Sequence, residues 1–167
     1  MSINQETLKG IQGLLVFKIN DKEYCSDIKN ISAVLKLRDA FGGQSNRNNG
    51  ILYYNDLSFN ILDMHKILKI NKVEKSTNSR IILFETFCKR FGFLIDKIIE
   101  IITTDSIFLE NSLDLFPASN KEFISGELII QDRTIFFMDF EKLSKELKNL
   151  EVLITNISSP EEIKYFI

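Results

Sequence analysis

The residues that could carry chemistry in this chain begin with two aspartates at matching places, Asp63 and Asp139. Two carboxylates can work as general acid and general base in one site. Each of these aspartates, however, follows a predicted strand and precedes a predicted helix, where aspartate is a favoured N-cap residue. Helix capping is therefore the favoured interpretation of both, and the pattern predicts no catalytic pair.

His65 is the only histidine, and it falls on a short helix predicted over residues 64–69. A lone histidine there is expected to be an exposed polar residue, and no second histidine or cysteine pair gives metal-ligand spacing. Asp96 lies inside an apolar strand, where a carboxylate is costly unless it is paired. Lys97, Arg90 or a neighbouring loop is the expected partner of Asp96.

The cysteines and glycines do not form a redox or phosphate-binding motif. Cys25 and Cys88 are too few for a disulfide framework and lack CxxC spacing, so both are expected to be reduced. The pair Gly42-Gly43 lacks the spacing and the lysine of a P-loop, and neither GxSxG nor HExxH occurs. The sequence predicts that the protein is not an enzyme and uses no metal or cofactor. Gly50, Gly92 and Gly126 are expected to serve turns, bulges or close backbone contacts.

Composition limits the classes of partner. The chain has 167 residues, of which 44% are hydrophobic and 26% charged, as is typical of a globular protein. A formal net charge of -2 with scattered basic residues argues against nucleic acid binding. The amino terminus resembles no signal peptide, and no apolar run approaches the ~18 residues of a membrane helix. We expect a cytoplasmic protein that does not insert into a membrane.

The elements that must position these residues are mainly β-strands with turn residues between them. Asn55-Asp56 is predicted to close a tight hairpin between Ile51–Tyr54 and the strand that ends at Asp63. Residues 36–49 are predicted to be a loop and residues 71–80 a linker. Further predictions are a hairpin through Asn20–Lys22, a strand Ile81–Phe87, a turn at Cys88–Arg90, a long strand from Phe91, a hairpin turning at Asp132-Arg133, an amphipathic helix over 139–154 and a tail over 155–167.

The chain also repeats itself. Residues 50–66 lie over residues 126–142 without a gap, with an offset of 76 residues. A second match, with an offset of 67 residues, places residues 15–31 over residues 82–98. Such self-similarity indicates a duplicated supersecondary unit. We therefore expect two related halves, docked side by side, with a groove that binds rather than catalyses.

Five segments, in order and spacing, resemble the CheW-like domain. They are Leu15–Tyr24 with Ile28 and Ile31, Gly50 before the Asn55-Asp56 turn, Leu62–Met64, Gly92–Ile98 and Phe123–Gly126, and the match covers about residues 14–143. The resemblance implies a mainly β fold of two tandem SH3-like five-stranded β-barrel subdomains that share a core, with short helices and a C-terminal amphipathic helix. Subdomain one would cover about 14–70 and subdomain two about 81–138.

The resemblance also implies a non-enzymatic chemotaxis adaptor that couples chemoreceptors to the histidine kinase CheA. Its partners would be the regulatory domain of a CheA-type kinase, the signalling tip of a methyl-accepting chemoreceptor, and CheW or CheA neighbours in a ring. Such a protein is cytoplasmic and reaches the membrane only through receptor arrays. The partner-binding residues carried over are Ile31, Ala33, Val34, Tyr54, Asn55 and Asp56, with Leu94, Asp96 and Ile98 as a second group.

Two departures from the family pattern leave alternatives open. The family usually has Arg-Gly at the first hairpin, where this chain has Asn55-Asp56, and often has a glutamate where this chain has Ala33. Losing a charge-assisted contact at a desolvated interface could cost a few kcal/mol. A divergent paralogue that fills the array or serves another receptor class is one alternative. A small-molecule sensor that uses the groove between the barrels is a less favoured one.

Overall fold

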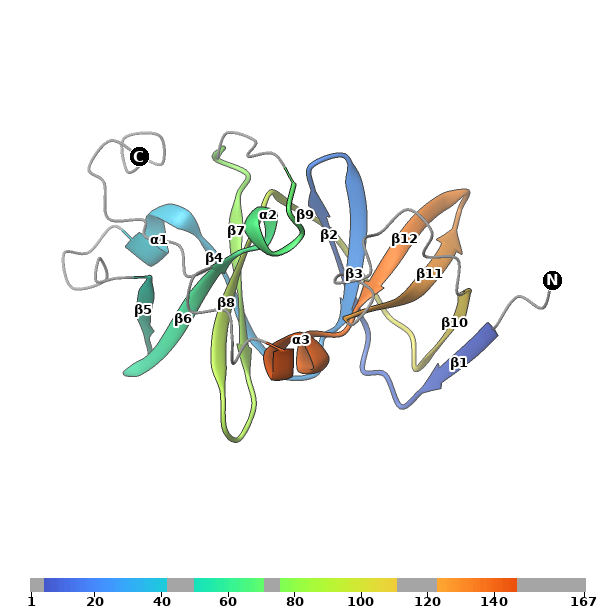
Figure 1. Ribbon diagram of the computed structural model, residues 1–167, viewed down its shortest axis with the longest axis horizontal. Helices are drawn as coiled ribbons and strands as arrows, with labels where there is room; N and C mark the ends of the chain where they lie inside the picture. The colour runs from blue at the N-terminus through green and yellow to red at the C-terminus, as the bar shows by residue number, and fades with distance from the viewer. Residues whose placement is uncertain (1–4, 42–49, 71–75, 111–122, 147–167) are drawn as a thin grey trace. The chain divides into compact units, whose positions relative to one another are not determined.

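The computed structural model describes residues 5–41, 50–70, 76–110 and 123–146 (Figure 1). Within these residues the fold is mainly β, as the sequence predicts. The strands are β1 Gln5–Lys9, β2 Leu14–Ile19, β3 Lys22–Asp27, β4 Ile31–Lys36, β5 Ile51–Tyr54, β6 Leu57–Asp63, β7 Arg80–Glu85, β8 Arg90–Ile95, β9 Lys97–Ile102, β10 Ser106–Glu110, β11 Ile124–Ile130 and β12 Arg133–Met138. The helices are α1 Leu37–Phe41, α2 Met64–Ile67 and α3 Phe140–Glu146.

The strands form two sheets, and each sheet belongs to one compact unit. The first unit runs up to Lys29 and resumes from Ile99 to Glu146, and its sheet has the order β1-β10-β11-β12-β3-β2-β9. The second unit runs from Asn30 to Ile98, and its sheet has the order β4-β7-β8-β6-β5. The second unit has the five strands expected of each barrel, and the first has seven.

The units do not follow the expected division into residues 14–70 and 81–138. Hairpin β2–β3 joins hairpin β11–β12 in the first unit, and hairpin β7–β8 joins hairpin β5–β6 in the second. The physical reason is a pair of parallel contacts, β12 with β3 and β6 with β8, which link strands far apart in the sequence. Each sheet therefore combines strands from both repeats, and the second unit is inserted into the first.

The duplication itself is visible in the strand register. Ile61 on β6 lies opposite Gly92 on β8, and Phe137 on β12 lies opposite Cys25 on β3. The first residue of each pair differs by the 76-residue offset and the second by the 67-residue offset. Two pairings that are separate in the chain therefore repeat in the same register, which confirms the internal repeat.

The two matching hairpin turns also share one backbone conformation. Asn55 and Asp56 have φ values of +49° and +63°, and Gln131 and Asp132 have +50° and +62°. Positive φ at both central residues is the conformation that closes a two-residue hairpin with the twist of its strands. The Asn55-Asp56 turn is confirmed. The second turn was expected one residue later, at Asp132-Arg133, but Arg133 already begins β12.

Part of the expected loop over residues 36–49 is helical. Helix α1 covers Leu37–Phe41. Its residues Leu37 and Ala40 are spaced three apart, lie on one helix face and are buried in the core of the second unit. This short segment therefore gains its stability from packing, which is why hydrophobic periodicity over a longer window misses it. Residues 42–49 lie outside the described part of the chain.

Other boundaries differ by a few residues. The predicted strand Ile81–Phe87 is β7, which ends at Glu85, and residues 86–89 form the turn. The long strand predicted from Phe91 is divided at Asp96 into β8 and β9, which enter different sheets. Helix α3 begins at Phe140, directly after its predicted cap. The expected continuation to residue 154 and the tail over 155–167 lie outside the described residues.

Each unit has its own hydrophobic cluster. In the second unit the buried members come from α1 and the strands of its sheet, and in the first unit they come from six strands and the segment before β2. The second-unit cluster comprises Leu37, Ala40, Leu52, Phe59, Ile61, Ile81, Leu83 and Leu94. The first-unit cluster comprises Ile11, Leu14, Val16, Cys25, Ile107, Leu109, Leu128, Ile135 and Phe137.

Three glycines occupy positions that limit larger side chains. Gly50 has a φ of +73°, a conformation that suits glycine. A Cβ added at Gly126 would lie 2.9 Å from the backbone oxygen of Glu110. Gly92 is closed in by side chains, since an added Cβ would lie 2.5 Å from Cδ1 of Ile61. Each glycine thus serves local geometry, a strand start for one and a close contact for the other two.

Candidate functional site

The first predicted group of binding residues lies on two strands of the second unit. Ile31, Ala33 and Val34 belong to β4, which is one edge of the five-stranded sheet. Burial alternates along β4, so that Ile31 and Ala33 face inward in part and Val34 is 39% exposed. An edge strand also presents unpaired backbone groups, which makes β4 available for contact with another protein.

Tyr54, Asn55 and Asp56 lie at the tip of hairpin β5–β6, at the other edge of the same sheet. Asn55 and Asp56 are exposed, while Tyr54 packs against the core of the second unit. The preceding residue, Tyr53, is 48% exposed and offers an aromatic ring. The resemblance did not identify Tyr53, although the alternation of side chains along a strand places it on the face opposite Leu52 and Tyr54.

Helix α1 connects these two edges. It contacts both β4 and β5, and its residues Leu37 and Ala40 are buried. Ala33 of β4 and Tyr54 of β5 pack against the same hydrophobic cluster. The curled sheet therefore supports both predicted segments from one core, and a partner could contact them as one surface. We call β4 together with the Tyr53–Asp56 tip the edge surface.

The second predicted group is less uniform. Leu94 on β8 is 2% exposed and belongs to the core cluster, so its side chain is not on the surface. Ile98 on β9 is partly exposed. Asp96 lies between β8 and β9, and its carboxylate contacts a residue that the sequence did not suggest. The three residues therefore do not form one exposed patch.

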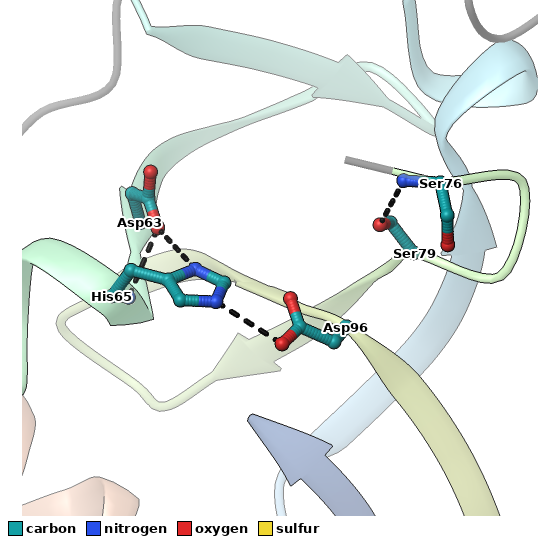
Figure 2. Close-up of polar contacts among 5 residues, drawn as sticks. All are labelled: Asp63, His65, Ser76, Ser79 and Asp96. Atoms are coloured by element: carbon teal, nitrogen blue, oxygen red, sulfur yellow. Dashed lines mark hydrogen bonds and ion pairs between the residues drawn. The ribbon is translucent and has the colours of Figure 1, made fainter. Parts of the chain in front are cut away.

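The partner of Asp96 is His65. Figure 2 shows the imidazole of His65 lying between two carboxylates. Nε2 is 3.1 Å from Oδ2 of Asp96, and Nδ1 is 3.1 Å from Oδ1 of Asp63. The same Asp63 oxygen also accepts a hydrogen bond from the backbone N–H of His65 at 3.0 Å. The imidazole thus joins the start of α2 to the junction of β8 and β9.

The charge of this arrangement follows from its geometry. Both ring nitrogens can donate to a carboxylate only when the imidazole is protonated. The hydrogen bonds to Asp63 and Asp96 raise the pKa of His65 from 6.5 to about 9, with the bond to Asp63 the larger cause, although burial opposes the charged form. His65 is therefore an imidazolium at neutral pH, and the net charge of the three side chains is negative.

Two sequence expectations are corrected here. His65 was expected to be an exposed polar residue, but it is only 5% exposed. Asp96 was expected to pair with Lys97, Arg90 or a loop, but it pairs with His65, and Arg90 pairs with Glu85 at 3.3 Å. Periodicity could have suggested the burial of His65, because it lies between the buried residues Met64 and Ile67.

Both aspartates at the strand-to-helix junctions act as caps. Asp63 Oδ1 accepts from the N–H of His65, and Asp139 Oδ1 accepts from the N–H of Lys142 at 3.0 Å. The predicted capping role is confirmed for each. Among the described residues, His, Cys, Asp and Glu side chains do not gather in threes in a way that could hold a metal ion. The described helices are also too short and too polar to cross a membrane.

Comparison with known proteins agrees with this arrangement. The model of the CheW-like domain family matches residues 13–148. Among solved structures, the scaffolding protein TtCheW from Thermoanaerobacter tengcongensis is 21% identical, with a TM-score of 0.59 over 77% of this chain and 88% of that one. This likeness confirms the mainly β fold with two SH3-like barrels. Curated protein sequences give no match.

Proposed function

Because this chain belongs to the CheW-like domain family, we propose that it is a chemotaxis adaptor that couples chemoreceptors to a CheA-type histidine kinase by protein binding. The family match, which extends over residues 13–148, is the observation that carries this proposal. Members of the family are scaffold and adaptor proteins rather than enzymes. The proposed partners are the kinase regulatory domain, the receptor signalling tip and neighbouring CheW or CheA molecules in a ring. The proposed location is the cytoplasm, beneath receptor arrays.

The edge surface is the proposed contact for the kinase. It combines apolar side chains, Val34 at 39% and Tyr53 at 48% exposure, with the polar tip formed by Asn55 and Asp56. Apolar residues surrounded by a polar rim are the usual composition of a protein interface, and tyrosine is a frequent hot-spot residue. The rigid core beneath β4 and β5 means that little conformational entropy is lost when a partner binds.

The first experiment is a pull-down from native cytoplasm followed by titration of the recovered CheA regulatory domain. We expect saturable binding that the variant Asp56→Lys weakens by about tenfold or more, as for loss of a polar contact at an interface. Asp132→Lys is the matched control, because Asp132 has the same positive φ and occupies the same turn position in hairpin β11–β12. The strain of placing lysine at such a φ is then equal in both variants.

The outcome separates the proposal from its rivals. Binding that falls with Asp56→Lys but not with Asp132→Lys supports the edge surface as the kinase contact. Equal loss in both variants would remove that surface from the proposal. Recovery of receptors without CheA, or of neither partner, would contradict the coupling function as a whole.

A divergent paralogue is the second candidate, and the neutral Asn55 favours it. The resemblance implies an arginine at this turn, and Asn55 is exposed at a tip where an arginine could contact a partner. Asn55→Arg tests the point in a reconstituted receptor and kinase assay. Stronger kinase control would show that the wild-type contact is merely weakened. Unchanged control would favour a protein that fills the array or serves a different receptor class.

A further inference from the structure

The outer face of the first unit carries two exposed apolar side chains on neighbouring strands, β10 and β11 (Figure 1). Phe108 is 51% exposed and Ile129 is 60% exposed. Their chain neighbours Leu109 and Leu128 are both buried in the core of the unit. Since successive side chains in a strand point to opposite faces, Phe108 and Ile129 point away from the core.

The register brings these two side chains together. Glu110 lies opposite Glu127 in the antiparallel pairing of β10 with β11. Two residues further along each strand from that pair are Phe108 and Ile129, which therefore lie across from each other on the outer face. Thr7 on β1 lies opposite Phe108, and Thr134 on β12 lies opposite Ile129. The four residues form a row across the sheet, which we call the outer row.

Charged residues lie on both sides of the outer row, with opposite sign. Glu110 and Glu127 are two residues away on one side, on the same face. Lys9 on β1 is exposed and lies opposite Ser106, two residues away on the other side. The acidic and basic positions are therefore about 13 Å apart along the strands, with the apolar pair midway between them.

We propose that this face is the contact surface of a symmetric dimer of the chain. A two-fold axis along the outer row stacks Phe108 on Phe108 and Ile129 on Ile129. The same operation reverses the strand direction, so that Lys9 of each copy comes beside Glu110 of the other. A surface with a central apolar pair and opposite charges at equal distances on either side is complementary to itself, which is the requirement of an isologous interface. A second copy of this chain is the partner that this pattern fits.

The contact is small and the dimer is correspondingly weak. Two apolar side chains with one ion pair on each side belong at the low end of interface sizes, where association is transient. A dissociation constant on the order of 100 µM is the expected scale. Such a dimer would form where the protein is concentrated, and it uses no residue of the edge surface. The inference does not depend on the proposed coupling function.

Sedimentation velocity of the full-length chain, from about 5 to about 500 µM, tests the inference. The wild type should pass from monomer to dimer over this range. Ile129→Lys should weaken association at least tenfold, because it places two like charges at the centre of the contact. Lys145→Glu is the matched control for charge, since Lys145 is an exposed lysine on α3, and it should leave the dimer unchanged.

A charge-exchange experiment identifies the partner as a second copy. Lys9→Glu and Glu110→Lys should each dimerise several-fold more weakly than wild type, because each alone places like charges side by side. In an equimolar mixture, position 9 of one variant faces position 110 of the other with opposite charge at both ends of the interface. The mixture should therefore associate within about threefold of the wild-type affinity.

Three results would overturn the inference. They are a wild-type chain that stays monomeric over the whole range, a dimer that Ile129→Lys leaves intact, and a mixture that associates no better than the separate variants. Capture of a different protein by this face with a monomeric wild type would also replace the second copy as its occupant. The variants are surface changes, and circular dichroism with urea unfolding verifies that they remain folded. Unchanged binding of CheA by Ile129→Lys keeps this test separate from the proposed function.

Discussion

Ile61 on β6 lies opposite Gly92 on the parallel strand β8, and the glycine leaves the space that the isoleucine side chain fills. A Cβ at Gly92 would be 2.5 Å from Cδ1 of Ile61 and 2.9 Å from Cγ2 of Ile81. Parallel pairing of β6 with β8 joins the two repeats inside the second unit. This single glycine therefore allows the close packing on which that connection depends.

We predict that Gly92→Ala destabilises the protein by about 1–3 kcal/mol, since an extra methyl group in a packed core forces its neighbours to move. Urea unfolding monitored by circular dichroism measures the change. Ser58→Ala is the control, because Ser58 is exposed on β6 and its loss should change stability by less than about 0.5 kcal/mol. An unchanged unfolding midpoint for Gly92→Ala would show that the Ile61 and Ile81 side chains yield freely.

His65 should give the protein a stability that falls as the pH rises. Its pKa in the folded state is about 9, above the 6.5 of an unperturbed histidine, so the folded protein holds an additional proton between these values. The stabilisation is fully present below pH 6.5 and is lost as the pH rises through about 9. Its size is on the order of 3 kcal/mol, from about 1.36 kcal/mol per pKa unit.

The single histidine makes this prediction direct to measure. The Cε1 proton resonance of His65 should titrate with a midpoint near 9 in the folded protein. The free energy of unfolding by urea should be larger at about pH 6 than at about pH 9.5, and His65→Gln should remove most of that difference. A titration midpoint near 6.5 would mean that the two carboxylates do not hold the imidazolium in solution.

Asp96→Asn should weaken the same arrangement from its other side. The change replaces one charge-assisted hydrogen bond, and loss of stability by about 1–3 kcal/mol is expected. The titration midpoint of His65 should also fall, because one of its two acceptors loses its charge. Lys29→Gln is the control, since Lys29 is the exposed residue at the matching position of the other repeat. Equal effects of the two variants on stability would contradict the proposed contact.

The edge surface provides a prediction about binding. Val34→Asp should reduce affinity for the CheA regulatory domain by about tenfold or more, because it places a charge on the apolar part of the surface. Ile101→Asp is the matched control, since the 67-residue offset places Ile101 on β9 where Val34 lies on β4, and Ile101 is 66% exposed. Isothermal titration calorimetry measures both. Equal affinities of the two variants would exclude β4 from the kinase contact.

Local signals in the sequence were sufficient for the hairpins and caps. Asn55-Asp56 has the residue types that accept positive φ, and Asp63 and Asp139 are followed by residues that change from strand to helix periodicity. These features depend on a few neighbouring residues. The repeat was also visible, because its matching positions serve the same local roles in both copies.

The pairing of distant strands could not be read in the same way. Parallel contacts of β6 with β8 and of β12 with β3 depend on which surfaces fit in three dimensions, and nothing in the turn residues between them specifies it. His65 and Asp96 are 31 residues apart, so their contact follows from that pairing. The assignment of α1 and the division into units were missed for the same reason.

Insertion of the second unit into the first also has a consequence for synthesis on the ribosome. The second unit is one continuous segment, which is complete once Ile98 has left the exit tunnel. Strands β2 and β3 leave the tunnel earlier, but β3 must wait for its neighbour β12, which ends at Met138. The nascent chain therefore passes through a stage with one finished barrel and an unpaired hairpin preceding it. An open strand edge of this kind is a site for aggregation, and a chaperone that shields it would protect this protein during translation.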